Sequence, residues 1–90
     1  MARLLNIGFG NVVNSDKIIA VVSPDAAPIK RLIQSVRGTP ELVDATQGRK
    51  TKAVIVTGER ILILSALQPE TIAKRFLETN QFTDKGDRDE

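Results

Sequence analysis

The sequence contains no cysteine, histidine, tryptophan or tyrosine. Without cysteine, neither a disulfide framework nor a thiolate metal site can form, so the composition does not support an oxidising compartment. Without histidine, the chain lacks the commonest general base and the commonest metal ligand. Ser/His/Asp and Cys/His catalysis are therefore excluded, and we expect a protein that is not an enzyme and carries no cofactor or metal.

Long hydrophobic runs are also missing. No stretch approaches the ~20 apolar residues that a membrane-spanning helix needs. Near the amino terminus, Asn6, Gly8 and Gly10 interrupt the apolar residues before the core of a signal peptide can form. We therefore expect a cytoplasmic protein with no membrane partner, and no motif indicates a small-molecule substrate.

The charges are unevenly distributed along the chain. The 90 residues carry 13 Lys and Arg against 11 Asp and Glu, a formal net charge of +2. Residues 83–90 are acidic overall and lack apolar side chains, so we expect a disordered tail there. The remaining residues, 1–82, predict a single folded domain, because a chain this short leaves no room for a second core. The folded part is the basic part.

Three segments before the first helix favour strands or turns. Residues 3–7 predict a short strand that ends at the GFGN turn of residues 8–11, where glycines permit unusual backbone angles. Residues 12 and 13 can continue pairing after this turn. Residues 17–22 (KIIAVV) predict a strand with too little polarity for a solvated face, so we expect it to be central in its sheet.

Two segments predict helices. The first begins after Ser23-Pro24, with Asp25 as N-cap and Pro28 in the first turn. Its apolar stripe has helical spacing: Ile29, Leu32, Ile33 and Val36. The second begins at Pro69, and its expected buried side consists of Ile72, Ala73, Phe76 and Leu77.

Three further strands are predicted over residues 41–46, 51–57 and 60–65, and a tight Gly-X turn at Gly58-Glu59 makes the last two a hairpin. The sequence thus predicts an α+β fold in the order ββαβββα. We expect a small mixed, mainly antiparallel sheet of about five strands with two helices.

The last two strands contain the continuous apolar runs AVIV and ILIL, which indicate coverage on both faces. Two short helices would cover only part of the two faces of a sheet of about five strands. A neighbouring copy of the chain is the simplest additional cover, because large exposed apolar patches are uncommon on monomers. The alternative is a sheet with one buried face and scattered exposed apolar residues.

The segment QGRKTK, residues 47–52, places Arg49, Lys50 and Lys52 at a turn between two strands, with no acid from residue 45 to 58. Such residues are most often solvated surface charges. A basic loop of this kind also suits phosphate contact or entry into a minor groove. With no Tyr or Trp beside it, a base-stacking platform for single strands is poorly supported, and no helix-turn-helix or zinc-finger spacing is present. Duplex DNA contact, multiplied by assembly, is the favoured interpretation.

Four blocks of the sequence resemble the RemA family of bacterial extracellular-matrix regulators: NIGFGN, VSPDAAPIKRLI, DATQGRKTKAVIV and LSALQPETIAKR. They lie in order over most of residues 5–77. The resemblance implies a cytoplasmic, nucleoid-associated DNA-binding transcriptional regulator of biofilm-matrix genes. It also implies an octamer-like, ring-shaped homo-oligomer whose partners are double-stranded DNA and further copies of the chain.

The resemblance also implies roles for particular residues. DNA contact maps onto Lys17, Arg49 and Lys50, and Lys52 fills the last basic position of the loop. Pro28 maps onto a proline associated with function, which we interpret as a structural or assembly residue. The chain departs from the family pattern, because Lys replaces Arg at positions 17, 50 and 52 and Gln47 replaces Tyr. Only Arg49 keeps a planar donor fork in the loop, so we expect Arg49→Ala to cost more DNA affinity than Lys52→Ala, measured at fixed salt.

Two alternatives stay open at the level of sequence. One is an oligomeric structural or protein-interaction module whose basic loop docks an acidic protein. The other is an RNA-binding protein that makes a shape-based duplex contact.

Overall fold

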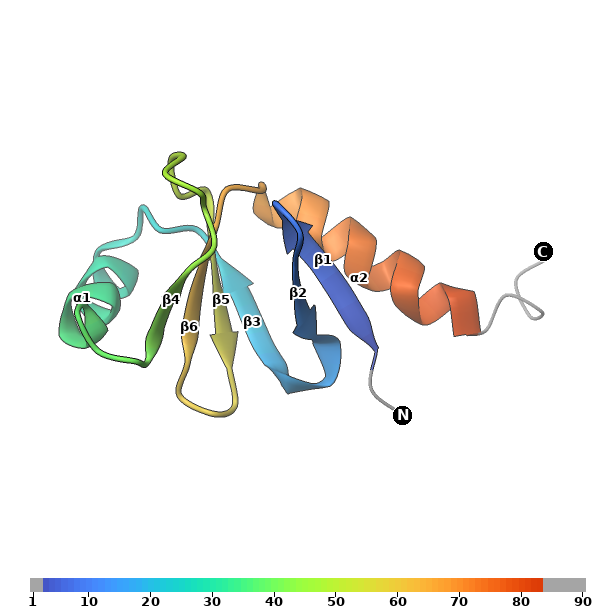
Figure 1. Ribbon diagram of the computed structural model, residues 1–90, viewed down its shortest axis with the longest axis horizontal. Coiled ribbons are helices and arrows are strands. Elements are labelled where there is room, and N and C mark those ends of the chain that lie inside the picture. Colours follow the sequence, from blue (N-terminus) through green and yellow to red (C-terminus); the bar gives the residue numbers. More distant parts are fainter. Residues whose placement is uncertain (1–2, 84–90) are drawn as a thin grey trace.

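The computed structural model describes residues 3–83, with side chains described as far as residue 78. It contains two sheets and two α-helices (Figure 1). The elements are β1 (Leu4–Gly8), β2 (Asn11–Asn14), a 3-10 turn (Ser15–Lys17), β3 (Ile18–Val22), α1 (Ala27–Val36), β4 (Leu42–Asp44), β5 (Ala53–Thr57), β6 (Leu62–Ser65) and α2 (Pro69–Thr83). The α+β class and the two helices are confirmed.

The predicted single sheet of five strands is wrong. Strands β1 and β2 form a two-stranded antiparallel sheet, and the other four strands form a second sheet in the order β3-β5-β6-β4. Three consecutive positive φ angles, 106° at Gly8, 55° at Phe9 and 78° at Gly10, reverse the chain so that residues 11–14 pair with β1. The 3-10 turn then ends this pairing and leads the chain into the second sheet.

Strand β3 is not central, contrary to the sequence prediction. It is an edge strand of the four-stranded sheet and, within residues 3–83, pairs with β5 alone (Figure 1). The central strands are β5 and β6. Apolar side chains of β3 instead line a groove between this strand and α2, and Ile19 is 69% exposed.

Both faces of β5 and β6 are covered by the same chain. On one face, Ile55 and Ile63 pack with Leu5 and Ile7 of β1 and with Ile72 of α2. On the other face, Val54, Leu62 and Leu64 pack beneath Ile33 of α1. The β1–β2 hairpin therefore provides the cover that the sequence analysis assigned to a neighbouring copy.

The helix starts agree only partly with prediction. Helix α1 has Ala26, not Asp25, as its N-cap, because Asp25 lies one residue too early, and no side chain caps it. Pro28 occupies its first turn as expected. Helix α2 begins at Pro69, as predicted. On its expected buried side Ile72 is 1% exposed, but Phe76 is 36% and Leu77 is 56% exposed, because α2 extends past the core.

The β5–β6 hairpin is confirmed, but its turn is longer than predicted. The backbone N–H of Thr57 donates to the carbonyl of Ile61 at 3.2 Å, which leaves residues 58–60 as the loop. The positive φ angle of 66° falls on Arg60, so Gly58-Glu59 is not a two-residue Gly-X turn.

Two further sequence expectations concern the acidic carboxy-terminal tail and the lack of a membrane-spanning helix. The acidic tail falls almost wholly on residues 84–90, outside the described residues, and Thr83 is the last residue of α2. Within residues 3–83, neither helix combines the length and hydropathy that a bilayer crossing requires.

Candidate nucleic-acid interface

Three loops meet at one end of the four-stranded sheet. Strand β5 is antiparallel to β3 and β6, and β4 is parallel to β6, so β3, β4 and β6 all run in one direction. The segments that follow them, residues 23–26, 45–52 and 66–68, therefore leave the sheet at the same end, as Figure 1 shows at the top of the view. Both helices also begin here, and helix N-termini carry partial positive charge. We call this end the loop end.

The basic loop, residues 46–52, is built on a defined turn. Gln47 and Gly48 have φ angles of 56° and 78°, and the backbone N–H of Arg49 donates to the carbonyl of Thr46 at 3.0 Å. Two consecutive positive φ angles closed by this bond define a type I′ turn. The predicted turn is confirmed, and it fixes the direction in which residues 49–52 leave it.

Asp44 holds the start of the basic loop. Its Oδ1 accepts hydrogen bonds from the backbone N–H of Thr46 at 2.9 Å and from the Thr46 hydroxyl at 2.6 Å. These two bonds, with a smaller contribution from the charge of Arg37, lower the pKa of Asp44 below its ordinary value of 3.8, although partial burial opposes the shift. Thr46 itself is 2% exposed, so the first residue of the turn is anchored in the protein.

Ser65 connects the basic loop to its neighbours. Its side chain is fully buried, and its hydroxyl donates to the carbonyl of Ile7 at 2.9 Å and accepts from the backbone N–H of Leu67 at 3.1 Å. Its own carbonyl accepts from the N–H of Lys52 at 2.9 Å. One residue therefore fixes the end of β1, the start of the 66–68 segment and the end of the basic loop.

The β1–β2 turn lies against the basic loop. The guanidinium carbon of Arg49 is 5.4 Å from the centroid of the Phe9 ring, within the range of a cation–π contact. Phe9 is 47% exposed. Sequence reasoning missed this residue, because it treated GFGN as a plain turn and found no aromatic beside the cations. The available signal was a large apolar side chain between two glycines, where no core position was expected.

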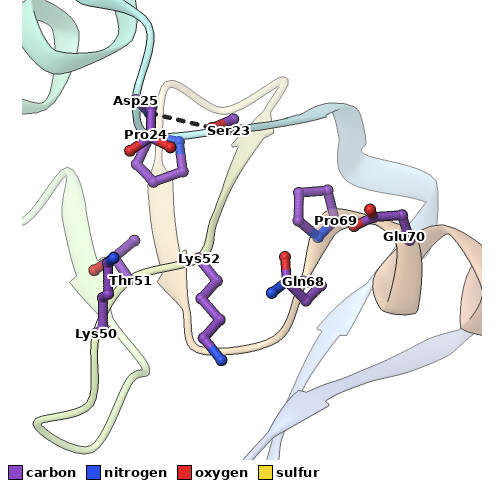
Figure 2. Close-up of a pocket in the computed structure, with 9 residues that line it drawn as sticks. All are labelled: Ser23, Pro24, Asp25, Lys50, Thr51, Lys52, Gln68, Pro69 and Glu70. Carbon is purple, nitrogen blue, oxygen red and sulfur yellow. Dashed lines mark hydrogen bonds between the residues drawn. The ribbon is translucent and has the colours of Figure 1, made fainter.

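Two hollows flank the basic loop and share Lys50 and Lys52. The first, of about 270 Å³, is bounded by the cations of the loop, Phe9, Ala66 and Leu67. The second, of about 340 Å³, lies between the loops that follow β3, β4 and β6 and also contains two acids, Asp25 and Glu70. In Figure 2 the Lys52 side chain extends away from both of these acids. Within residues 3–78, no carboxylate lies at ion-pair distance from Arg49, Lys50 or Lys52.

Lys17 lies at the opposite end of the sheet. Its carbonyl accepts from the N–H of Gly58 at 2.9 Å, and its ammonium is 3.0 Å from a carboxylate oxygen of Glu59. The length of β5, five residues or about 17 Å, separates this position from the basic loop. The chain therefore brings together Arg49, Lys50 and Lys52 and keeps Lys17 apart. Pro28 is exposed in the first turn of α1, near the loop end.

The grouped cations of the basic loop are of the kind that suits contact with an anion. Over the part of the chain that the structure describes, no three His, Cys, Asp or Glu residues are grouped as a metal site would require. The fold and the site thus define a small α+β protein that presents a cationic loop on a hydrogen-bonded turn.

Residues 4–76 match the RemA-like family, described as extracellular matrix regulatory protein A-like, and the chain belongs to this family. The resemblance seen in the sequence is confirmed.

Relatives with similar sequences are named for regulation. A protein of a Synechococcus species, named "Putative regulatory protein", is 60% identical over 75 residues, which cover 83% of this chain and 84% of the relative. A relative of the same name from Geobacillus thermodenitrificans is 51% identical over 86 residues, covering 96% and 99% of the two chains. These names describe regulatory proteins rather than enzymes.

Proposed function

We propose that this protein is a transcriptional regulator that binds the backbone of duplex DNA through the basic loop, repeated in a ring-shaped homo-oligomer. The observation that carries the proposal is the grouping of Arg49, Lys50 and Lys52 on an anchored turn without a carboxylate partner among the described side chains. Membership of a family named for extracellular-matrix regulation supports matrix genes as targets. Binding to chromosomal DNA would place the protein at the nucleoid.

The number of cations explains why assembly belongs to the proposal. About three phosphate contacts per protomer would lose roughly 40-fold in affinity between 50 and 200 mM salt, at a slope of about 0.9 per contact. A single protomer would therefore bind weakly at cellular salt. Several copies of the loop on one assembly would multiply the contacts, and linked sites gain orders of magnitude in affinity when they bind simultaneously.

An apolar groove supports self-association. It has a volume of about 410 Å³ and lies between β3 and α2, with Ile19, Phe76 and Leu77 among its lining residues. These three side chains are 69%, 36% and 56% exposed in the isolated chain. Burying them against another copy would remove apolar surface from water at a gain of about 25 cal/mol per Å². A ring needs two different contact surfaces per protomer, and the groove would supply one of them.

Lys17 has a separate place in the proposal. Because it lies about the length of β5 from the basic loop, it would contact a different stretch of the duplex, or the same stretch from another protomer. Its ion pair with Glu59 is largely exposed on both sides, so phosphate can compete for the ammonium at small cost.

The test is a titration of a duplex of about 50 base pairs at several salt concentrations, with light scattering to follow assembly. The Arg49→Ala, Lys50→Ala double variant is compared with an Arg31→Ala, Lys74→Ala control, which removes the same charge from exposed helix positions. We expect the first variant to keep its assembly and lose most DNA affinity, and the control to keep both. Equal losses in the two variants would reject the basic loop as the binding site.

Competition experiments separate the alternatives. Duplex DNA, duplex RNA, single-stranded DNA and a non-nucleic polyanion such as heparin are compared as competitors at equal phosphate or sulfate charge. Preference for duplex DNA supports the proposal. Equal competition by every polyanion favours a module that docks acidic partners, and preference for duplex RNA favours an RNA-binding protein.

A further inference from the structure

The β1–β2 turn has no assigned role, although it places an exposed phenylalanine among the cations of the basic loop. Phe9 is 47% exposed and has a φ angle of 55°, which is unfavourable for a bulky side chain. The same glycines that reverse the chain hold the ring at the surface. A hydrophobic side chain in an unfavourable conformation at the surface requires an explanation other than the core.

The turn is held rigidly against the loop end. A Cβ atom at Gly8 would lie 3.4 Å from Cγ of Leu67, so the backbone of the turn packs closely on the 66–68 segment. Asn11 donates from its side-chain amide to the carbonyl of Gly8 at 3.0 Å, and Ser65 bonds the carbonyl of Ile7. The backbone from which the ring projects is therefore held in place relative to the end of the basic loop.

Arg49 is the residue that the ring contacts. Its guanidinium carbon lies 5.4 Å from the ring centroid, and no carboxylate within residues 3–78 lies at ion-pair distance from it. A contact with an aromatic face restricts the rotamers of a long side chain but leaves its charge and its in-plane N–H donors available, whereas a carboxylate would occupy both. This arrangement orders the arginine without neutralising it.

We propose that Phe9 is a positioning residue for DNA binding, which holds the Arg49 guanidinium in the orientation that meets a phosphate and so extends the DNA-binding surface to the β1–β2 turn. This inference rests on the proposed function. The effect acts through Arg49, because a preorganised side chain loses less conformational entropy when it binds. An exposed cation–π contact corresponds to roughly a two- to fivefold change in affinity for each protomer that contacts DNA.

A double-mutant cycle tests the inference. DNA affinity is measured for the wild type, Phe9→Leu, Arg49→Ala and the combination, with Phe9→Tyr as the conservative variant that keeps the ring and Val12→Ala as a control on the same hairpin. We expect Phe9→Leu to weaken binding, Phe9→Tyr and Val12→Ala to leave it unchanged, and Phe9→Leu to have no further effect in the Arg49→Ala background. An additive loss in that background, or no loss in the single variant, overturns the proposal.

A second measurement does not depend on DNA. The side-chain protons of Arg49 near the ring face should have ring-current-shifted NMR resonances in the free protein, lost in Phe9→Leu and retained in Phe9→Tyr. If these resonances show no such shift in the wild type, the contact is absent and the inference fails. This result needs only the wild-type protein, so it holds even if the Phe9→Leu variant does not fold. If the wild type binds no DNA while the shift is present, the proposed function fails instead, so the two failures are distinguishable.

Discussion

Lys17 and Glu59 form an exposed ion pair, with side chains 54% and 58% accessible, at the end of the sheet opposite the basic loop. Such pairs contribute about 0–1 kcal/mol to stability, so this pair does little to stabilise the fold. Its main effect would be that the Glu59 carboxylate competes with phosphate for the Lys17 ammonium. If Lys17 contacts phosphate, Glu59 opposes DNA binding, because its carboxylate occupies the same ammonium.

Glu59→Gln should therefore raise DNA affinity, by up to about fivefold for each protomer in contact, because Lys17 is released without removal of any cation. The measurement is a DNA titration at low salt. Glu41→Gln removes the same charge just before β4, at the opposite edge of the sheet from β3, and serves as control. An equal rise in both variants would assign the effect to net charge and remove Lys17 from the binding surface.

At the scale of elements, the type I′ turn and the two hydrogen-bonding residues beside it determine how the basic loop is presented. Ser65 is the more important of these, because it satisfies polar groups on β1 and on the 66–68 segment inside the protein. Ser65→Ala leaves the carbonyl of Ile7 and the N–H of Leu67 without this partner. We expect a loss of about 1–3 kcal/mol in the free energy of unfolding, measured by urea denaturation.

Ser35→Ala is the matched control for this loss. The Ser35 hydroxyl donates to the carbonyl of Leu32 at 2.6 Å on the exposed surface of α1, where water can replace it. Its replacement should change stability by less than about 0.5 kcal/mol. A similar small effect at Ser65 would mean that the loop end does not depend on this buried hydroxyl.

Asp44 makes the anchoring of the basic loop dependent on pH. The hydrogen bonds from Thr46 lower the pKa of Asp44 in the folded protein, so folding favours the ionised carboxylate. A depressed pKa contributes stability that is present above the unfolded-state value, near 4, and is lost as the pH falls through the folded-state value. The stability difference between wild type and Asp44→Ala should therefore shrink from about pH 5 to about pH 3, followed by urea denaturation at each pH. A constant difference would show that Asp44 acts through packing alone.

Sequence patterns predicted the features that depend on residues close together in the chain and missed those that depend on residues far apart. The basic turn was predictable because a glycine and the absence of acids mark it locally, and the β5–β6 hairpin because its strands are adjacent in sequence. The separation of Lys17 from the basic loop follows from the antiparallel pairing of β3 with β5, which no local pattern encodes. The Phe9–Arg49 contact joins residues 40 positions apart. It depends on the β1–β2 hairpin; the pairing of residues 12 and 13 was expected from the sequence and is confirmed, but the separation of this hairpin into its own sheet was not expected.

At the scale of the whole molecule, the covered and uncovered apolar surfaces lie in different places from those expected. The apolar runs of β5 and β6 are covered by α1, β1 and Ile72 of α2. Among the described side chains, one exposed apolar surface is the groove between β3 and α2, where an edge strand lies beside a helix that extends past the core. An exposed apolar edge of this kind favours association with another chain, and the multiplication of weak phosphate contacts requires such an association.

Ile19→Asp should consequently disrupt the proposed assembly, because it places a charge in an apolar contact that cannot solvate it. The expected result is a shift to smaller species in light scattering, together with a loss of DNA affinity that is larger than the removal of any single cation causes. Val12→Asp introduces the same charge at a side chain that is 53% exposed on β2, outside the groove, and should leave the assembly intact. If Ile19→Asp remains fully assembled and still binds DNA, another surface joins the protomers. If it dissociates yet binds with unchanged affinity, the phosphate contacts of one protomer suffice and multivalency is not required.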